Sequence, residues 1–355
     1  MMPFKELERP RVLVIAMSGI GNLLMQSPLW TRLRDVNPTA EIAVLVAPRG
    51  TAEVLERNAD IATIFRGNPK PSLREWIGMT RSVQRGKFDI GIVTYPGQLV
   101  TSSSLLFFGT VKMRIGHRYT FHALKSTGLF LSHALPSPSV HDVIQNLRLL
   151  EPLGVSSEPN AARYVFPLGR EDHDAAEQFL AKHALEETPL LGIHPGAYKD
   201  MEYKRWPTER WIHLGRKLEE RSHAKILIFG GPEERALKAA VWNGIGRNTA
   251  FEVDLPLRAT AALLRHCRCF VSNDSGLMHV AVSQNVPTFG LFGPTDERRT
   301  APFGPHGHVI RAAGTQPTYN VKELWRIRAQ RAPDPSLLAL SVDHVLLKTH
   351  EIVGV

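Results

Sequence analysis

Short apolar runs alternate with amphipathic segments along the chain. The run Arg11–Ala16 is apolar and stops at a turn, which is typical of a strand buried on both faces of a parallel sheet. A helix is expected over Leu23–Val36, and Pro38 ends it. The alternation continues and predicts strands at 41–47, 61–65 and 90–95, and helices at 51–57 and 72–85.

The same pattern restarts in the second half of the chain. A helix over 141–153 ends at Gly154, and residues 159–170 have no strong period, so they are interpreted as a connection between two halves. Thr208 is the expected N-cap of an amphipathic helix that runs to Arg221. The other elements predicted here are strands at 189–194, 225–229, 251–253, 269–272 and 288–292, and helices at 171–183, 233–242, 257–266 and 277–283.

Strands that alternate with helices predict doubly wound parallel sheets, covered by helices on both faces. A length of 355 residues is enough for about two domains. We therefore expect two α/β halves in tandem. Ligands of such sheets bind at the carboxyl ends of the strands, so a cleft between the halves is the expected site.

The composition is that of an ordinary globular protein, with 43% hydrophobic and 22% charged residues, and it excludes a collagenous or disordered chain. The two cysteines, Cys267 and Cys269, form neither a disulfide framework nor a zinc motif, which fits a reducing compartment. The net charge of +9 is compatible with nucleic acid, an anionic membrane surface or a phosphorylated substrate. No block of like charges indicates a nucleic-acid tail, and no apolar signal core follows the first residues.

A glycine-containing turn follows the first strand. It reads Ser18-Gly19-Ile20-Gly21-Asn22, and glycines at such a place let the backbone turn tightly and approach a ligand. The dinucleotide fingerprint is absent, because its third glycine position falls on Leu24. The alternative is a turn that serves packing only.

A loop of small residues followed by basic residues begins the second half. His194-Pro-Gly196-Ala precedes Lys204-Arg-Trp-Pro207, and free amides together with ammonium groups suit a diphosphate. The alternative is a solvated basic loop. Trp206 and Trp211 are interpreted as packing residues.

Two further strand ends carry candidate ligand contacts. In Gly230-Gly-Pro-Glu233-Glu234 a carboxylate can accept hydrogen bonds from ribose hydroxyls, or it can simply complement a helix dipole. Thr295, in a Pro-Thr turn, can reach a ligand or only shape the turn. The sequence leaves open whether Glu233, Glu234 and Thr295 contact a ligand or have only a structural role.

The stretch Asn273-Asp-Ser-Gly-Leu-Met-His279 follows a strongly apolar strand. Asp274 or Ser275 can cap the next helix, and the amides of Ser275 and Gly276 can hold a phosphate. A cap alone also explains Asp274. A serine hydrolase is a weak alternative, because Ser275 is not in a G-x-S-x-G motif, and His279 at this spacing more often supports packing.

Seven stretches, in this order along the chain, resemble glycosyltransferase family 9, the heptosyltransferases of lipopolysaccharide core assembly. NDSGLMH together with GLFGPT is the most specific pair. The stretches are VLVIAMSGIGNLLMQSPLW, RIGHRY, LGIHPGA, KRWPTERW, ILIFGGPEE, FVSNDSGLMHVA and TFGLFGPTDERR.

The resemblance implies a GT-B fold, with two Rossmann-like doubly wound domains that face a central cleft. Residues 1–168 would form an acceptor-binding domain and residues 169–340 a nucleotide-sugar-binding domain. A C-terminal helix within 341–355, over about Ser341–Glu351, would cross back to the first domain. The family also implies an inverting, metal-independent transfer from a nucleotide sugar, typically ADP-heptose.

The family's donor contacts map onto this sequence by motif. Lys204 resembles the lysine near the donor diphosphate, and Asp274–Gly276 resemble the contacts to the donor sugar and phosphate. Glu234, or its neighbour Glu233, resembles the ribose contact, and Leu255 stands where the family's backbone meets the base.

One position departs from the family pattern. Well-known members have an aspartate, the proposed general base, where this chain has Asn22, and an amide takes up no proton near neutral pH. The cysteines that many members carry near the C-terminus are also missing. Because of Asn22, a non-catalytic nucleotide-sugar-binding protein stays an alternative. A GT-B-like sugar-nucleotide epimerase or hydrolase is the other alternative.

The sequence thus indicates a cytoplasmic sugar transferase that uses no cofactor and binds no nucleic acid. Its partners would be a nucleotide sugar and a saccharide or lipid-linked saccharide acceptor, with a peripheral contact to the inner membrane surface left open. Asn22 and Lys204 are the candidate catalytic residues. The candidate substrate-binding residues, none of them assigned to a metal, are Gly19, Gly21, His194, Gly196, Lys204, Glu233, Glu234, Leu255, Asp274, Ser275, Gly276, His279 and Thr295.

Overall fold

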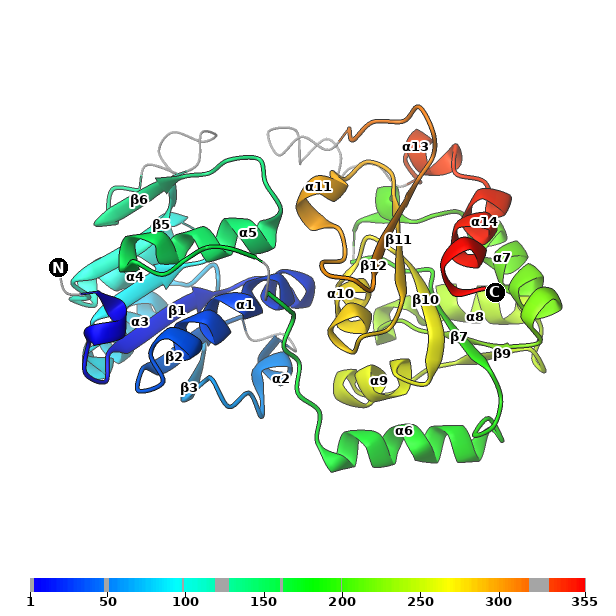
Figure 1. Ribbon diagram of the computed structural model, residues 1–355, viewed down its shortest axis with the longest axis horizontal. Coiled ribbons are helices and arrows are strands. Elements are labelled where there is room, and N and C mark those ends of the chain that lie inside the picture. Colours follow the sequence, from blue (N-terminus) through cyan, green and yellow to red (C-terminus); the bar gives the residue numbers. More distant parts are fainter. Residues whose placement is uncertain are drawn as a thin grey trace. The chain divides into compact units, whose positions relative to one another are not determined.

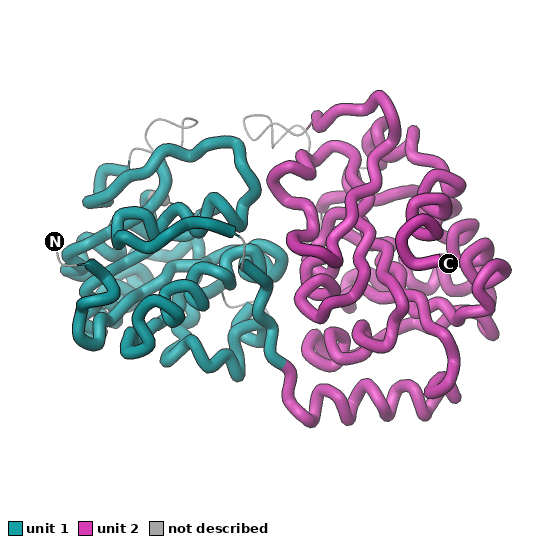
Figure 2. The backbone as a smooth tube through the Cα atoms, in the orientation of Figure 1, with its two compact units in different colours: residues 1–167 teal, residues 168–355 magenta. Residues whose placement is uncertain are grey.

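The chain forms two compact units in the computed structural model, residues 1–167 and residues 168–355 (Figure 2). Each unit is a parallel sheet with helices packed against it (Figure 1). Tyr119, at the end of the RIGHRY stretch, lies outside the described residues. The structure describes residues 3–47, 51–97, 99–118, 128–159, 162–198, 200–318 and 332–354.

The first unit contains a six-stranded sheet in the order β3-β2-β1-β4-β5-β6, with every pair parallel. β1 lies in the middle and is buried after its first residue, as its apolar run predicts. The strands are β1 (Arg11–Ala16), β2 (Glu41–Val46), β3 (Thr63–Arg66), β4 (Ile90–Val93), β5 (Met113–Arg118) and β6 (His133–Pro136).

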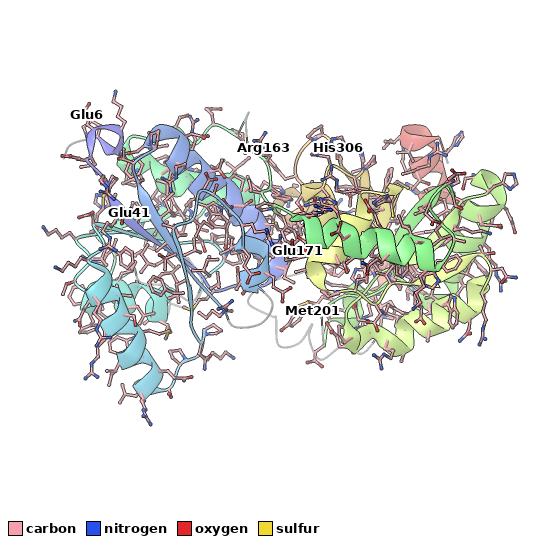
Figure 3. All side chains as sticks on the ribbon, turned by 90° about the horizontal axis from the view of Figure 1, so that it is seen from below. Glu6, Glu41, Arg163, Glu171, Met201 and His306 are labelled. Carbon is pink, nitrogen blue, oxygen red and sulfur yellow. The ribbon has the colours of Figure 1, made fainter. Side chains whose placement is uncertain are left out.

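Helices cover both faces of the first sheet. α1 packs with α5, and α3 packs with α4 on the other side, as Figure 3 shows. Leu13 and Ile15 of β1 share a core cluster with Val83 of α3 and Leu105 of α4. The helices are α1 (Ile20–Val36), α2 (Thr51–Leu55), α3 (Leu73–Gly86), α4 (Leu99–Phe108) and α5 (Asp142–Leu147), with short 3-10 turns η1 (Phe4–Glu6) and η2 (Arg148–Leu153).

The second unit repeats this topology. Its strand order is β12-β11-β10-β7-β8-β9, so β7 lies between β8 and β10 just as β1 lies between β2 and β4. All of its strand pairs are parallel. The strands are β7 (Leu190–His194), β8 (Lys225–Ile228), β9 (Ala250–Glu252), β10 (Cys267–Asn273), β11 (Thr288–Phe292) and β12 (Gly307–Arg311).

One face of the second sheet is covered by α7, α8 and α14, which share a core cluster with it. Trp206 and Trp211 are buried in this cluster and meet edge to face, which confirms that they are packing residues. α6 packs on α9. The helices are α6 (Arg170–Lys182), α7 (Thr208–Ser222), α8 (Arg235–Ile245), α9 (Leu257–Leu264), α10 (Gly276–Ser283), α11 (Glu297–Thr300), α13 (Pro335–Leu338) and α14 (Val342–Val353), with 3-10 turns η3 (Glu202–Lys204) and η4 (Pro232–Glu234).

The C-terminal helix α14 packs against α7 of the second unit, with Val345 and Leu346 in the shared core. Ser341 caps it, because its hydroxyl accepts the amide N–H of His344. The expectation that this helix also reaches the first unit stays a prediction.

Two local expectations are wrong. Thr208 is not an N-cap: Pro207 occupies that position in an extended conformation, and Thr208 is the first helical residue. α1 begins at Ile20 rather than Leu23, so Gly21 and Asn22 belong to its first turn. No helix within the described ranges is long and apolar enough to cross a membrane.

Candidate active site

Three of the motifs meet at the centre of the second sheet. The chain leaves β7 toward β8 on one side, and β10 pairs with the other side of β7 and continues to β11. This reversal of strand order is where parallel sheets open a crevice at their carboxyl ends. His194 is the last residue of β7 and Asn273 the last of β10, so their loops border this crevice.

A buried hydrogen-bonded pair joins the end of β7 to the loop after β8. His194 Nε2 lies 2.9 Å from Glu234 Oε2, and the two side chains are 4% and 5% exposed. Glu234 Oε2 also accepts the Gly231 N–H at 2.9 Å. Burial opposes ionisation of Glu234, but the charge and hydrogen bond of His194 and the Gly231 N–H outweigh it and hold its pKa below the ordinary value. Glu234 is therefore a fixed carboxylate.

The glycine at position 196 is required by this carboxylate. A Cβ on Gly196 would overlap Glu234 Oε1. Gly230 has a φ of +155° beside the same carboxylate, a conformation that only glycine adopts readily. These glycines thus make room for Glu234.

The other ring nitrogen of His194 reaches two serines. Nδ1 lies 3.0 Å from Ser275 Oγ and 3.3 Å from Ser272 Oγ. The two hydroxyl oxygens are 3.0 Å apart, and Ser272 donates to the carbonyl of Asn273. Ser275 occupies the N-cap of α10 but its side chain bonds no helix amide, so the expected side-chain cap is wrong. Its hydroxyl belongs to the His194 network instead.

Lys204 and Asp274 form a second pair. Lys204 Nζ donates to Asp274 Oδ2 at 2.8 Å, and the side chains are 16% and 9% exposed. Burial raises the pKa of Asp274, but the charge and hydrogen bond of Lys204 outweigh it, and Thr295 and His279 lower it further. Asp274 is therefore an ionised partner of Lys204 and not the helix cap that the sequence also allowed.

Asn273 is a positioning residue that the sequence motifs did not single out. Its Oδ1 accepts the Trp206 N–H at 3.0 Å, and its Nδ2 donates to the carbonyls of Pro195 and Gly196 at 2.8 and 3.0 Å. The fully buried amide thus ties the Lys204 loop and the His194 loop to the end of β10. A buried polar residue at the last position of an apolar strand is the signal that can reveal such a residue.

The remaining candidates of the second unit lie apart from this network. Glu233 is exposed, whereas Glu234 is buried. Leu255 is half-buried in the loop after β9, where its carbonyl accepts the Thr260 hydroxyl. The neighbouring carbonyl of Val253 accepts the buried Lys238 ammonium at 2.7 Å, which fixes this loop against α8.

The first unit places Gly19 and Asn22 at the carboxyl end of β1. The chain turns tightly at Ser18, whose N–H donates to the carbonyl of Ala16 at 2.9 Å. Gly19 is the N-cap of α1 with a φ of −74°, so its own backbone does not need glycine. Apart from Gly19 and its two chain neighbours, no described residue has an atom within 4 Å of the position of a Cβ on Gly19. Asn22 is half-buried, and its side chain has no hydrogen-bond partner among the described residues.

Neither a metal site nor an exposed thiol occurs in the described part of the chain. There, no group of three or more His, Cys, Asp or Glu side chains could hold a metal ion. Cys267 and Cys269 are buried free thiols, and burial raises the pKa of Cys269 to about 12. They are inert core residues.

The family model described as glycosyltransferase family 9 (heptosyltransferase) matches residues 76–327. The chain belongs to this family. It is 28% identical to lipooligosaccharide heptosyltransferase 2 of Haemophilus ducreyi, over 97% of this chain and 99% of that protein. The protein is thus a glycosyltransferase, and the epimerase, hydrolase and binding-protein alternatives are not favoured.

Solved structures of the family share the fold. A family 9 glycosyltransferase from Veillonella parvula aligns with a TM-score of 0.82 and 22% identity, over 98% of both chains. The E. coli ADP-heptose lipopolysaccharide heptosyltransferase II aligns with a TM-score of 0.78 and 20% identity, over 97% of this chain and 98% of that one. The fold is the GT-B fold, as expected.

Proposed function

We propose that this glycosyltransferase transfers a heptose from ADP-heptose to a saccharide acceptor of the lipopolysaccharide type, with inversion at the anomeric carbon. The observation that carries the proposal is the buried Lys204–Asp274 pair at the start of α10, between the carboxyl ends of β7 and β10. The names of the Haemophilus ducreyi and E. coli relatives support heptose as the sugar and ADP as the carrier.

Lys204 and the first amides of α10 are the groups that would receive the donor diphosphate. A helix N-terminus presents unpaired N–H groups to an anion, here those of Ser275 and Gly276. Negative charge develops on the leaving phosphate as the glycosidic bond breaks. A preorganised ammonium and two amides stabilise that charge most in the transition state. These contacts lie within the chain's own residues and would need no metal.

Asp274 would hold Lys204 charged and in place. Its carboxylate is ionised, buried and 2.8 Å from the ammonium, so Lys204 keeps one fixed orientation before the donor arrives. The same carboxylate can accept hydrogen bonds from sugar hydroxyls, while His279 and Thr295 border it.

Glu234 is the better of the two candidates for the ribose contact. It is an ionised carboxylate whose position is set by His194 and the Gly231 N–H, whereas Glu233 is exposed. Leu255 lies in the loop after β9, on the same carboxyl edge of the sheet, which suits a contact to the base.

Asn22 would orient the acceptor. Its amide can donate and accept hydrogen bonds but takes up no proton. Either another group is therefore the base, or the acceptor hydroxyl loses its proton late, to solvent or to the donor phosphate. The open surroundings of Gly19 leave room for a ligand to approach the start of α1. A lipid-linked acceptor would be met at the inner membrane surface from the cytoplasm.

A panel of nucleotide sugars tests this proposal. ADP-heptose should raise the melting temperature of the protein, by mass action, more than GDP- or UDP-sugars do. Transfer to a heptose-containing or related saccharide acceptor should then yield a product with inverted anomeric configuration. A preference for a GDP- or UDP-sugar, or conversion of the donor without any acceptor, would overturn the proposal.

A further inference from the structure

Exposed apolar side chains gather on the outer side of the α3–α4 layer in the first unit. Leu73 and Ile77 of α3 are 75% and 37% exposed, and Phe107 and Phe108 at the end of α4 are 45% and 47% exposed. Leu129, beside Phe130, is 76% exposed. We call this surface the aromatic patch. Its six members are Leu73, Ile77, Phe107, Phe108, Leu129 and Phe130.

Ring contacts join the three phenylalanines of the patch into one cluster. The centroids of Phe107 and Phe108 are 5.2 Å apart, and Phe130 lies 5.4 and 5.8 Å from them. Trp76, between the α3 members of the patch in sequence, packs edge to face on Phe108 at 5.4 Å and donates to Ser104. Single exposed apolar residues are ordinary, but a contiguous set of this kind marks an interaction surface.

The core of the unit does not explain these side chains. α3 and α4 fill the core with other residues, namely Val83, Leu105 and Leu106. Figure 3 shows α3 at the outside of the unit, with side chains that project away from the sheet. The patch is therefore an additional apolar face of this layer.

The patch belongs to a strongly basic segment of the chain. Residues 70–118 contain eight Lys and Arg against two acidic residues, so this segment carries +6 of the net charge of +9. Its two acids have structural tasks, because Glu75 closes the capping box of α3 and Asp89 accepts the Arg11 N–H at 2.8 Å. The basic residues are Lys70, Arg74, Arg81, Arg85, Lys87, Lys112, Arg114 and Arg118, and all except the half-buried Arg114 are exposed.

Cations and rings are interleaved on this surface. The Arg114 guanidinium lies over the Phe107 ring, 5.3 Å from its centroid, and donates to the carbonyl of Phe130. Arg81 follows Ile77 by four residues on α3, which places it one turn along the same side of the helix. Aromatic and apolar side chains flanked by Lys and Arg are the composition that binds the headgroup region of anionic membranes.

We propose that the aromatic patch and its basic surround bind the surface of an anionic lipid bilayer, with the rings entering the headgroup region. The apolar members would contact the boundary of the hydrocarbon region. The net charge of +6 on residues 70–118 would be attracted by the negative surface potential of the bilayer. The inference extends the membrane encounter in the proposed function by naming the surface, but it stands on the first unit alone and requires no particular donor.

Co-sedimentation with lipid vesicles tests the proposal. The full-length protein should bind vesicles of phosphatidylcholine with phosphatidylglycerol several-fold better than vesicles of phosphatidylcholine alone, and salt should weaken the binding. The double variant Phe107→Ser/Phe108→Ser should lose most of this binding. The variant Arg81→Gln/Arg85→Gln should lose the preference for phosphatidylglycerol.

A matched control lies on the second unit. Leu347 and Ile352 of α14 are 54% and 46% exposed, comparable to the two phenylalanines, so Leu347→Ser/Ile352→Ser should bind vesicles as the wild type does. Equal binding to both vesicle types, or equal losses in the control and the Phe107/Phe108 variant, would overturn the proposal.

A second readout leaves the patch intact. Vesicles of brominated lipid should quench the tryptophan fluorescence of the wild type, and Trp76→Phe should remove most of that quenching, because Trp76 lies directly against Phe108. Quenching that Trp76→Phe leaves unchanged would contradict the placement of the patch. Neither measurement involves sugar transfer, so a wrong donor assignment would leave both results standing.

Discussion

The two units share one topology but carry different chemistry at the same place in it. At the carboxyl ends of β7 and β10, the second unit buries two ionised carboxylates, Glu234 bonded to His194 and Asp274 bonded to Lys204. At the carboxyl ends of β1 and β4, the first unit buries neutral amides. There Gln26 donates to the carbonyl of Tyr95, and Asn146 bonds both the N–H and the carbonyl of Tyr95.

The difference shows that strand order determines where a site can form, and side chains determine what it can bind. Burying charges costs more than burying amides, so paired charges at a crevice are a sign of function rather than of stability. The second unit is arranged for an anionic ligand. The neutral network of the first unit holds the loop after β4 in place and adds no charge there.

The largest effect should come from removing the charge of the second unit's crevice. Lys204→Ala should lower kcat on the order of a hundredfold or more, as for the loss of one preorganised oxyanion donor, with a smaller change in donor affinity. Steady-state kinetics with varied donor measure both values. Lys348→Ala, at an exposed lysine of α14, is the matched control. A raised KM with unchanged kcat would mean that Lys204 binds the donor equally in ground and transition states.

Two glycines test the comparison at the next level. Gly196→Ala should displace the Glu234 carboxylate and raise the donor Kd about tenfold, the equivalent of losing one charge-assisted hydrogen bond. Gly19→Ala, in open surroundings, should change the free energy of unfolding by less than about 1 kcal/mol. Calorimetric titration and urea unfolding measure these effects. If Gly19→Ala raised the donor Kd as much as Gly196→Ala, the contrast between the two loops would be wrong.

Substitutions of Asn22 test the proposed role of an uncharged residue at the carboxyl end of β1 in the first unit. Asn22→Ala should cost about 1–3 kcal/mol of transition-state stabilisation, the range for an unpaired polar partner, seen as a lower kcat/KM for the acceptor. Asn22→Asp should keep the fold and raise the rate at pH values above the pKa of the new carboxylate. A wild-type rate for Asn22→Ala would show that the acceptor binds elsewhere.

The smallest effect concerns pH. Glu234 and Asp274 have folded-state pKa values below their ordinary values of 4.5 and 3.8, so each stabilises the fold at higher pH. That stability should be fully present above about pH 5.5 and fall as the pH drops through and below 4.5. Urea unfolding across this range measures it. Glu234→Gln should reduce the dependence, whereas exposed Glu233→Gln should not.

Part of the fold follows directly from the sequence. The central strands β1, β7 and β10 are continuous apolar runs, and buried strands of this kind are recognisable without a partner. The sequence analysis did not predict the strands β5, β6 and β12. These strands are short and contain polar residues, so their strand conformation depends on pairing with a neighbouring strand. The motifs likewise placed His194 and Asp274 at strand ends and Lys204 in the loop that follows His194.

The sequence by itself determined which residues carry the site's charge, because the motif residues and their positions after apolar strands can be read directly. Only the tertiary structure decided how they are paired. In the structure, Glu234 and not Glu233 is the buried carboxylate, and Asp274 pairs with Lys204 instead of capping α10. Asn273 meets its partners across 67 to 78 residues of chain. Such contacts depend on which strands become neighbours in the sheet, and no local pattern of residues records that choice.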